Sequence, residues 1–140
     1  MGVLVKNFLG KWALMKGSCV YEQGLPPLDG QYRVTQKNKD IIFQMIWLDN
    51  SGERQEFIFK SRPDGLAIPF AGGDLADSLS TYKLSERELN TVAYKNGTRV
   101  MEVKRTLSNS LDQMTVSQTV FLSESEKPTN WSSYSKIVIH

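Results

Sequence analysis

The clearest local signal in the sequence is Leu89-Asn-Thr-Val-Ala-Tyr-Lys-Asn96-Gly97-Thr98-Arg-Val-Met-Glu-Val-Lys-Arg-Thr-Leu107. Two runs of residues that favour β-strands, 89–95 and 98–107, flank an Asn-Gly pair. Both central residues of a type I′ turn need a positive φ, which Asn and Gly adopt most readily. The stretch therefore predicts a tight antiparallel hairpin.

The same pattern recurs on both sides of this hairpin. Short runs with a period of two, rich in β-branched and aromatic residues, alternate with turn residues at hairpin distances. The other expected strands are Trp12–Val20, Gln31–Gln36, Ile41–Leu48, Glu53–Lys60, Leu66–Phe70, Ser78–Leu84, Met114–Leu122 and Trp131–Ile139.

The connections between these runs are short, so that neighbours in sequence become neighbours in the sheet. Gln23–Gly30 is expected to be a loop because it holds paired prolines, and Pro128-Thr129-Asn130 belongs to another loop. Little helix is expected, and any helix should be a short turn, with 73–80 as the most plausible place. A meander of this size avoids bare edges by closing on itself, so the sequence predicts an all-β fold, a single antiparallel up-and-down β-barrel of about eight to ten strands.

Composition limits the chemistry that such a barrel can perform. The chain has 140 residues, expected to form one domain over 1–140, and its net charge of +2 lacks the basic excess of nucleic-acid-binding proteins. One cysteine, Cys19, excludes an internal disulfide, and the one histidine, His140, excludes a catalytic triad or a histidine-cysteine metal cluster. The pair Asp74 and Asp77, beside Gly72-Gly73, is interpreted as turn-forming. We therefore expect no catalytic residues, no metal and no cofactor.

The start of the chain bears on its compartment. The apolar residues from Met1 are interrupted by Lys6 before they reach the length of a signal-peptide core. No stretch approaches the ~20 apolar residues of a membrane span. We expect a cytoplasmic protein without a membrane span.

Arg105 is the most informative charged residue. In the strand 98–107 it shares a face with the apolar Met101, Val103 and Leu107, which should point inward. A buried guanidinium needs a carboxylate, backbone carbonyls, water or an anionic ligand. The alternatives are an internal ion pair or a strand end that twists into solvent. In the next strand Gln118 is a lone polar residue on an apolar face, either a ligand contact or a hydrogen-bonded core amide.

Several of these residues carry a resemblance to a known family. Phe8-Leu9-Gly10-Lys11-Trp12 resembles the Gly-x-Trp signature of lipocalins and fatty-acid-binding proteins, together the calycins. The run from Lys104-Arg105-Thr106-Leu107 to a last strand with Tyr134 resembles the end of a fatty-acid-binding protein. In that family an inward arginine and an Arg-x-Tyr pair hold the ligand carboxylate, which implies that Arg105 and Tyr134 face a ligand. Most of the chain also resembles small bacterial lipocalin-like proteins.

Two departures from the family pattern are visible. Ser132 occupies the position two before Tyr134, where the second arginine would be. The run Tyr21–Gly30 is too short and too proline-rich for the two-helix lid of that family. The mouth of the barrel is therefore expected to be open or covered by loops.

A barrel of about eight strands can keep a cavity for one small ligand. A large indole can plug its closed end, a role assigned to Trp12 with Gly10. The residues predicted to contact a ligand are Arg105, Tyr134, Gln118, Met101, Val103, Phe43, Met45, Trp47, Phe57 and Phe59.

Two functions remain open. The first is non-enzymatic binding of a small hydrophobic or amphipathic molecule inside the barrel. The second is a barrel with a filled interior that acts through its surface as a protein-interaction or structural module, and a homo-oligomer is compatible with either. A barrel enzyme that polarises its substrate with Arg and Tyr is a third alternative.

Overall fold

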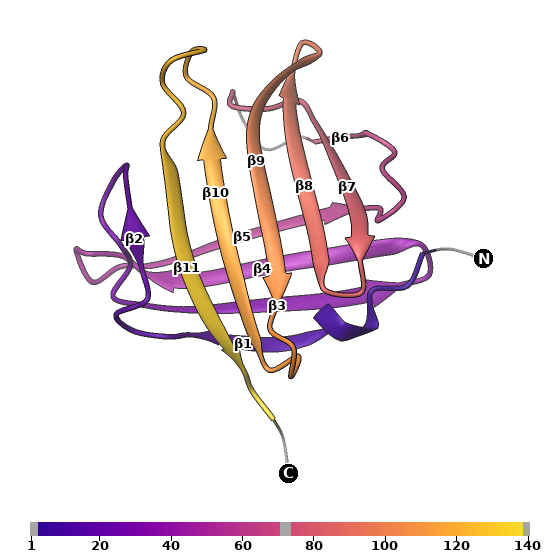
Figure 1. Ribbon diagram of the computed structural model, residues 1–140. Helices are drawn as coiled ribbons and strands as arrows, with labels where there is room; N and C mark the ends of the chain where they lie inside the picture. The colour runs from indigo at the N-terminus through magenta and orange to yellow at the C-terminus, as the bar shows by residue number, and fades with distance from the viewer. Residues whose placement is uncertain (1–2, 71–73, 139–140) are drawn as a thin grey trace.

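The computed structural model describes residues 3–70 and 74–138 and is built almost entirely of strands (Figure 1). The elements are the 3₁₀ helix η1 (Lys6–Phe8) and the strands β1 (Gly10–Leu14), β2 (Val20–Tyr21), β3 (Asp29–Lys37), β4 (Asp40–Leu48), β5 (Arg54–Ser61), β6 (Ile68–Pro69), β7 (Ser78–Ser85), β8 (Glu88–Lys95), β9 (Thr98–Leu107), β10 (Gln113–Val120) and β11 (Thr129–Lys136).

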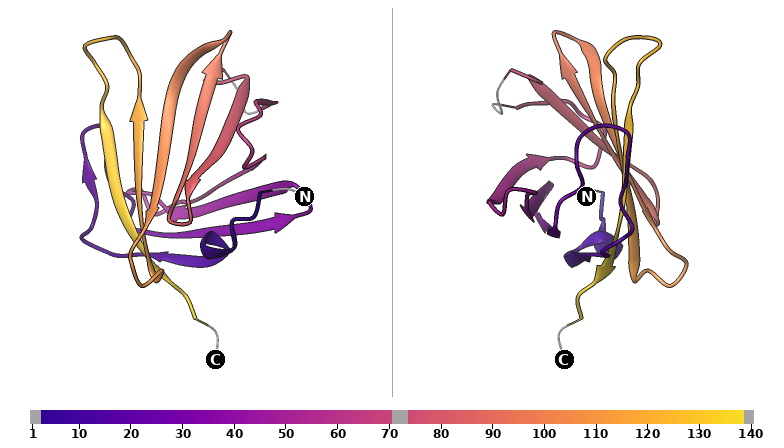
Figure 2. Two further views of the ribbon diagram at one scale, coloured as in Figure 1. Left: turned by 45° about the vertical axis from the view of Figure 1, so that its right-hand side comes forward. Right: turned by 90° about the vertical axis from the view of Figure 1, so that its left-hand side faces the viewer.

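The strands form one antiparallel sheet that curls into a nearly closed barrel. Their order is β5-β4-β3-β1-β11-β10-β9-β8-β7-β6, and β2 pairs with β11. The strands β3 to β5 cross the layer of β7 to β11 at a steep angle, and β1 joins the two layers (Figure 2). The predicted all-β antiparallel barrel is confirmed. The expected closure is incomplete, because β5 and β6 end the sheet order in the described part of the chain.

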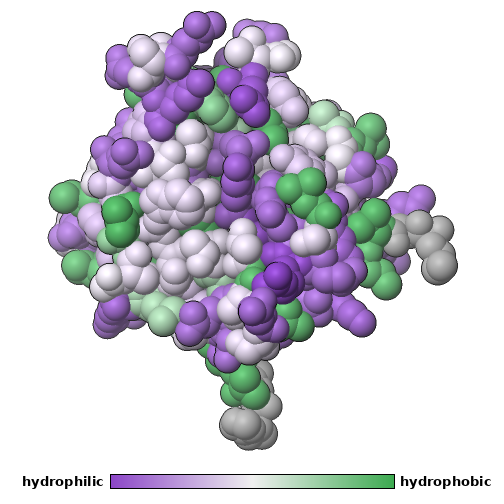
Figure 3. All heavy atoms as spheres, viewed as in Figure 1, coloured by the Kyte–Doolittle hydropathy of each residue, from purple (hydrophilic) through white to green (hydrophobic). Residues whose placement is uncertain are grey.

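The hairpin of β8 and β9 has the predicted turn at Asn96-Gly97. Asn96 and Gly97 have φ angles of 50° and 80°, so both central residues occupy the left-handed region that a type I′ turn requires. Buried and exposed residues alternate along β10, as expected for a strand with one inner and one outer face. Met114 and Val116 are buried, whereas Thr115 is exposed. Figure 3 shows the outer face, where hydrophilic and intermediate side chains dominate.

Three strand predictions were wrong at their ends. The run Trp12–Val20 is split, because the chain bends at Gly17 (φ 87°) and resumes as β2. The run Leu66–Phe70 contributes only β6, because Gly65 instead donates a backbone hydrogen bond to Thr81 of β7 at 2.8 Å. The last strand begins at Thr129, within the predicted loop, because Thr129 pairs with Thr119.

Helix is limited to one short turn in the described residues, as expected, but the turn does not lie at 73–80. From Asp74 onward this segment consists of bends that lead into β7, and the 3₁₀ turn lies at Lys6–Phe8 instead. The Gly72-Gly73 bend, His140 and the end of the expected strand at Ile139 lie outside the described residues.

Trp12 lies in the core near the end of the barrel that the N-terminal segment covers. Its side chain is fully buried, and its indole N–H donates to the carbonyl oxygen of Phe8 at 3.0 Å. The Lys136 ammonium lies 5.5 Å from the indole ring centroid. Gly10 has a φ of 120°, which an L side chain rarely adopts, and a Cβ there would lie 3.8 Å from Lys136 Cε. The Gly-x-Trp pattern therefore combines a backbone requirement with a large buried ring.

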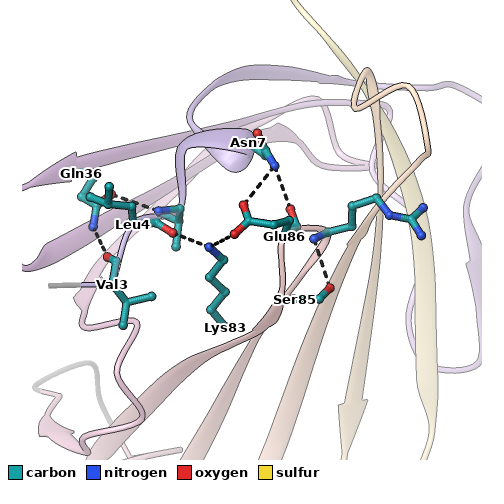
Figure 4. A network of polar contacts seen from close by, with 9 residues as sticks. Val3, Leu4, Asn7, Gln36, Lys83, Ser85 and Glu86 are labelled. Atoms are coloured by element: carbon teal, nitrogen blue, oxygen red, sulfur yellow. Dashed lines mark hydrogen bonds and ion pairs between the residues drawn. The ribbon is translucent and has the colours of Figure 1, made fainter.

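A polar network fastens the N-terminal segment over this end (Figure 4). Gln36 on β3 donates to the Val3 carbonyl at 2.8 Å, and Lys83 on β7 donates to the Leu4 carbonyl at 2.9 Å. Lys83 also binds the Glu86 carboxylate at 2.6 Å. The segment thus ties the β3 layer to the turn between β7 and β8.

The burial of Trp12 generates the first prediction. Trp12→Ala should lower the free energy of unfolding by ~3–5 kcal/mol, the usual loss for a large buried aromatic. Trp131→Ala is the matched control, because the Trp131 side chain is 47% exposed, and it should cost less than ~1 kcal/mol. Urea denaturation followed by circular dichroism measures both. Equal losses would contradict the core position of Trp12.

Candidate ligand cavity

The interior of the barrel holds a cavity of about 470 Å³. Alternation along β4 and β5 turns Met45, Trp47, Phe57 and Phe59 to its inner face, and Met45 pairs with Phe57 across the two strands. These side chains form an aromatic wall. The volume lies within the range of pockets that enclose one small molecule.

The predicted contact residues converge on this cavity. Arg105, Tyr134, Gln118, Met101, Val103, Met45, Trp47, Phe57 and Phe59 line it. Phe43 does not line the cavity. The centroid of its ring lies 4.1 Å from Arg105 Cζ, and the ring stacks on Phe59. Contact between Phe43 and a ligand is therefore unsupported, and the aromatic ring instead supports the cation.

Arg105, near the C-terminal end of β9, is held by three protein acceptors. Its side chain is 0% exposed, so the alternative that it twists into solvent is wrong. Nε donates to the Tyr32 hydroxyl at 2.8 Å, and Nη1 donates to Thr91 Oγ1 at 2.9 Å. Nη1 also lies 3.4 Å from the Leu89 carbonyl oxygen. These contacts hold the guanidinium plane in one orientation.

The charge of Arg105 has no acidic partner among the residues that the structure describes. Its Nη2 atom is also buried and without a hydrogen-bond partner there. Leaving a buried charged donor unsatisfied costs more than the few kcal/mol of a neutral group. Because Arg105 lines the cavity, this incompletely satisfied guanidinium is a polar feature of the cavity wall.

Two tyrosines extend this donor cluster. The Tyr32 and Tyr134 rings meet edge to face with centroids 5.5 Å apart. Burial raises the pKa of the Tyr134 phenol well above its ordinary value, so the group remains a neutral O–H donor at physiological pH. Ser132, which replaces the family's second arginine, is buried and lines the cavity close to Tyr134.

The sequence did not reveal Tyr32 and Thr91 as partners of Arg105. The sequence did indicate that both residues face inward. Tyr32 is two residues from the buried Val34 on β3. Leu89 pairs with Arg105 across the hairpin, and Thr91, two residues further on, lies on the same face. The missing information was that β3 and β9 face each other across the interior. Only the long-range pairing of β1 with β3 and β11 establishes this.

Both polar and apolar side chains surround the mouth of the cavity. Gln118 is exposed there, and its amide nitrogen lies 3.2 Å from the Met101 sulfur, so the alternative of a core amide is wrong. Leu25 and Leu75 line the cavity, although they are 74% and 77% exposed. The stretch between β1 and β3 contains β2 and loops, without a two-helix lid.

In residues 3–70 and 74–138, no group of three His, Cys, Asp or Glu side chains is placed to hold a metal ion. No helix in this part of the protein is long and apolar enough to cross a membrane. Asp77 accepts the backbone N–H of Asn96 at 2.8 Å, which supports a turn-forming role for this acid.

Comparisons with known proteins agree on the fold. A fatty-acid-binding protein of Schistosoma mansoni, solved with arachidonic acid, superposes with a TM-score of 0.59 at 13% identity, over 96% of this chain and 98% of that one. Zebrafish ileal bile acid-binding protein, solved with cholic acid, gives a TM-score of 0.53 at 12% identity, over 94% and 99%. Neither a protein-family model nor a curated protein matches the sequence. The chain therefore has a barrel fold like that of fatty-acid-binding proteins.

The unpaired charge generates a prediction about stability. Arg105→Met should leave the free energy of unfolding unchanged or raise it by about 1–4 kcal/mol, because an apolar side chain of similar length removes an incompletely satisfied buried charge. Urea denaturation of the ligand-free protein measures the change. A loss above ~3 kcal/mol would show that Arg105 holds the fold together.

The turn at the cavity mouth generates a prediction about pH. Hydrogen bonds from the Ser51 hydroxyl, the Glu53 backbone and the Gln55 amide hold the pKa of Asp49 at about 2. Because the pKa is lowered by folding, the stabilisation is complete above the unfolded value of ~4 and is lost as the pH falls through 2. Asp49→Asn should therefore melt below the wild type at pH 7, and thermal scans should show the gap closing between pH 4 and 2. A gap that persists at the acid end would contradict this linkage.

Proposed function

We propose that the protein binds a small hydrophobic or amphipathic molecule in its cavity, without chemical conversion, and holds the polar end against Arg105 and Tyr134. The observation that carries the proposal is the buried Arg105 guanidinium, whose Nη2 is unpaired among the described residues at the cavity wall. A ligand oxygen would supply the missing acceptor. The cavity itself weighs against the alternative of a barrel with a filled interior.

The donor cluster favours an acceptor-bearing head group. Arg105 Nη2 has no acceptor among the described residues, and the Tyr32 hydroxyl keeps its own proton after accepting from Arg105. The Tyr134 hydroxyl, which interacts with Ser132, is a further donor. A carboxylate, a carbonyl or an alcohol oxygen can satisfy them. With Ser132 in place of a second arginine, one cation meets the head group, so neutral ligands as well as acids are expected.

The rest of the cavity suits an apolar body. The aromatic wall of β4 and β5 offers contact area, and the exposed Leu25 and Leu75 surround the entrance. The arachidonic acid and cholic acid of the two similar structures are molecules of this class, one flexible and one rigid. A cytoplasmic location stays a prediction.

The proposal is tested by displacing a fluorescent apolar probe, such as anilinonaphthalene sulfonate, with hexadecanoic acid and with hexadecanol. Both should displace the probe from the wild type saturably. Arg105→Met should weaken the acid by about 10- to 100-fold, the equivalent of one hydrogen bond to a charged group, and the alcohol by less than about fivefold.

The matched control is Arg99→Met, which removes an exposed arginine from the same strand. It should leave both affinities unchanged, because the Arg99 side chain stacks on Phe121 and pairs with Glu102 instead of lining the cavity. No probe uptake by the wild type would refute binding. Equal losses for acid and alcohol would refute the role of Arg105.

A further inference from the structure

The strand β5 ends the sheet and has a free edge, which comes close to β7 but forms no ladder with it. It pairs with β4 along its length and is the last strand in the sheet order. In the part of the chain that the structure describes, no backbone group of Arg54–Ser61 bonds beyond β4. The segment after β5 is directed to the other side of the gap, since Gly65 bonds to Thr81 and Asp64 pairs with Tyr82.

The register of β4 and β5 tells which groups face outward. The Asp49 N–H donates to the Glu53 carbonyl at 2.9 Å, so that position 53 belongs to a hydrogen-bonded pair. Such pairs recur at every second residue of an antiparallel ladder, here at 55, 57 and 59. The N–H and C=O groups of Glu56, Ile58 and Lys60 therefore point away from β4, toward the free edge.

The side chains along this edge have a self-complementary order. Glu56 and Lys60 are exposed charges of opposite sign, and Ile58 between them is 52% exposed. Charged side chains ordinarily protect an edge strand from pairing. If a second β5 runs antiparallel about a two-fold axis at Ile58, however, Glu56 of each copy lies opposite Lys60 of the other. Ile58 then faces its own equivalent.

We propose that two copies of this chain associate through their β5 strands in this register. The three facing pairs each exchange two N–H···O bonds, as hydrogen-bonded antiparallel pairs do. On the inner face, Phe57 lies opposite Phe59 of the second copy, and aromatic cross-strand pairs stabilise sheets. The contact is isologous, so it closes after two copies and leaves no further edge of this kind.

The size of the contact sets its strength. One pair of short edge strands buries less than the standard area of a stable interface, so the dimer is weak and reversible, with a dissociation constant on the order of 10–100 μM. The proposal does not depend on occupancy of the cavity. Failure of ligand binding would leave it intact, and the reverse also holds.

Sedimentation equilibrium of the full chain from about 5 to 500 μM, a range that brackets this affinity, tests the proposal. The wild type should show a reversible monomer–dimer equilibrium. Glu56→Lys and Lys60→Glu should each weaken it at least about tenfold, because like charges then face each other directly. The double variant Glu56→Lys with Lys60→Glu restores opposite charges across the axis and should return the affinity to within about threefold of the wild type.

Two further variants separate pairing of the β5 edges from a general effect of charge and from unfolding. Lys104→Glu reverses an exposed charge on the outer face of β9 and should leave the equilibrium unchanged. Ile58→Pro removes an outward N–H and no bond to β4, so it should give a folded monomer by circular dichroism. A wild type that stays monomeric at the highest concentration overturns the proposal. So does a dimer that the double charge exchange fails to restore.

Discussion

The burial of one guanidinium without an acidic partner is the constraint around which the interior is organised. Arg105 reaches from β9 across the cavity to Tyr32 on β3, so its hydrogen bond connects the two layers of the barrel. The Phe43 ring and Thr91 stabilise the cation in part, but Nη2 remains without an acceptor among the described residues. The rest of the fold must supply the stability that this group does not.

Apolar packing fills the closed end of the barrel, close to Arg105. Trp12 pairs with Tyr32, which accepts the Arg105 hydrogen bond. Leu89, opposite Arg105, follows the turn between β7 and β8. Trp12, with its indole bonded to Phe8, lies where β1 pairs with both β3 and β11, and the N-terminal segment covers this end. At the mouth, exposed leucines and a charged turn leave the cavity accessible. The barrel can thus keep a hollow, donor-rich interior because its closed end is packed with apolar side chains.

Local patterns predicted what depends on neighbouring residues. Asn96-Gly97 predicted a turn because two positive φ angles are a local requirement, and alternation placed Arg105 on an inner face. The sequence could not show that β1 ends at Leu14 or that β6 is two residues long, because bonds to distant strands decide both. Ser133 accepts the backbone N–H of Met15 at 2.8 Å, and Thr81 accepts that of Gly65. Tyr32 was missed for the same reason, since its role exists only when β3 and β9 face each other.

The arrangement around Arg105 bears on how a ligand would be selected. Because Nε and Nη1 are held by Tyr32 and Thr91, the guanidinium offers the two N–H groups of one nitrogen, Nη2, instead of a fork of two nitrogens. Selection then depends on where a ligand places its acceptor oxygen, relative to an aromatic wall, more than on the charge of that oxygen. A second arginine at position 132 would shift this balance toward anions, since two cations require neutralisation. Under the proposed function, Ser132 avoids that requirement, so the site would accept neutral as well as acidic head groups and would disfavour molecules that bring no acceptor to Nη2.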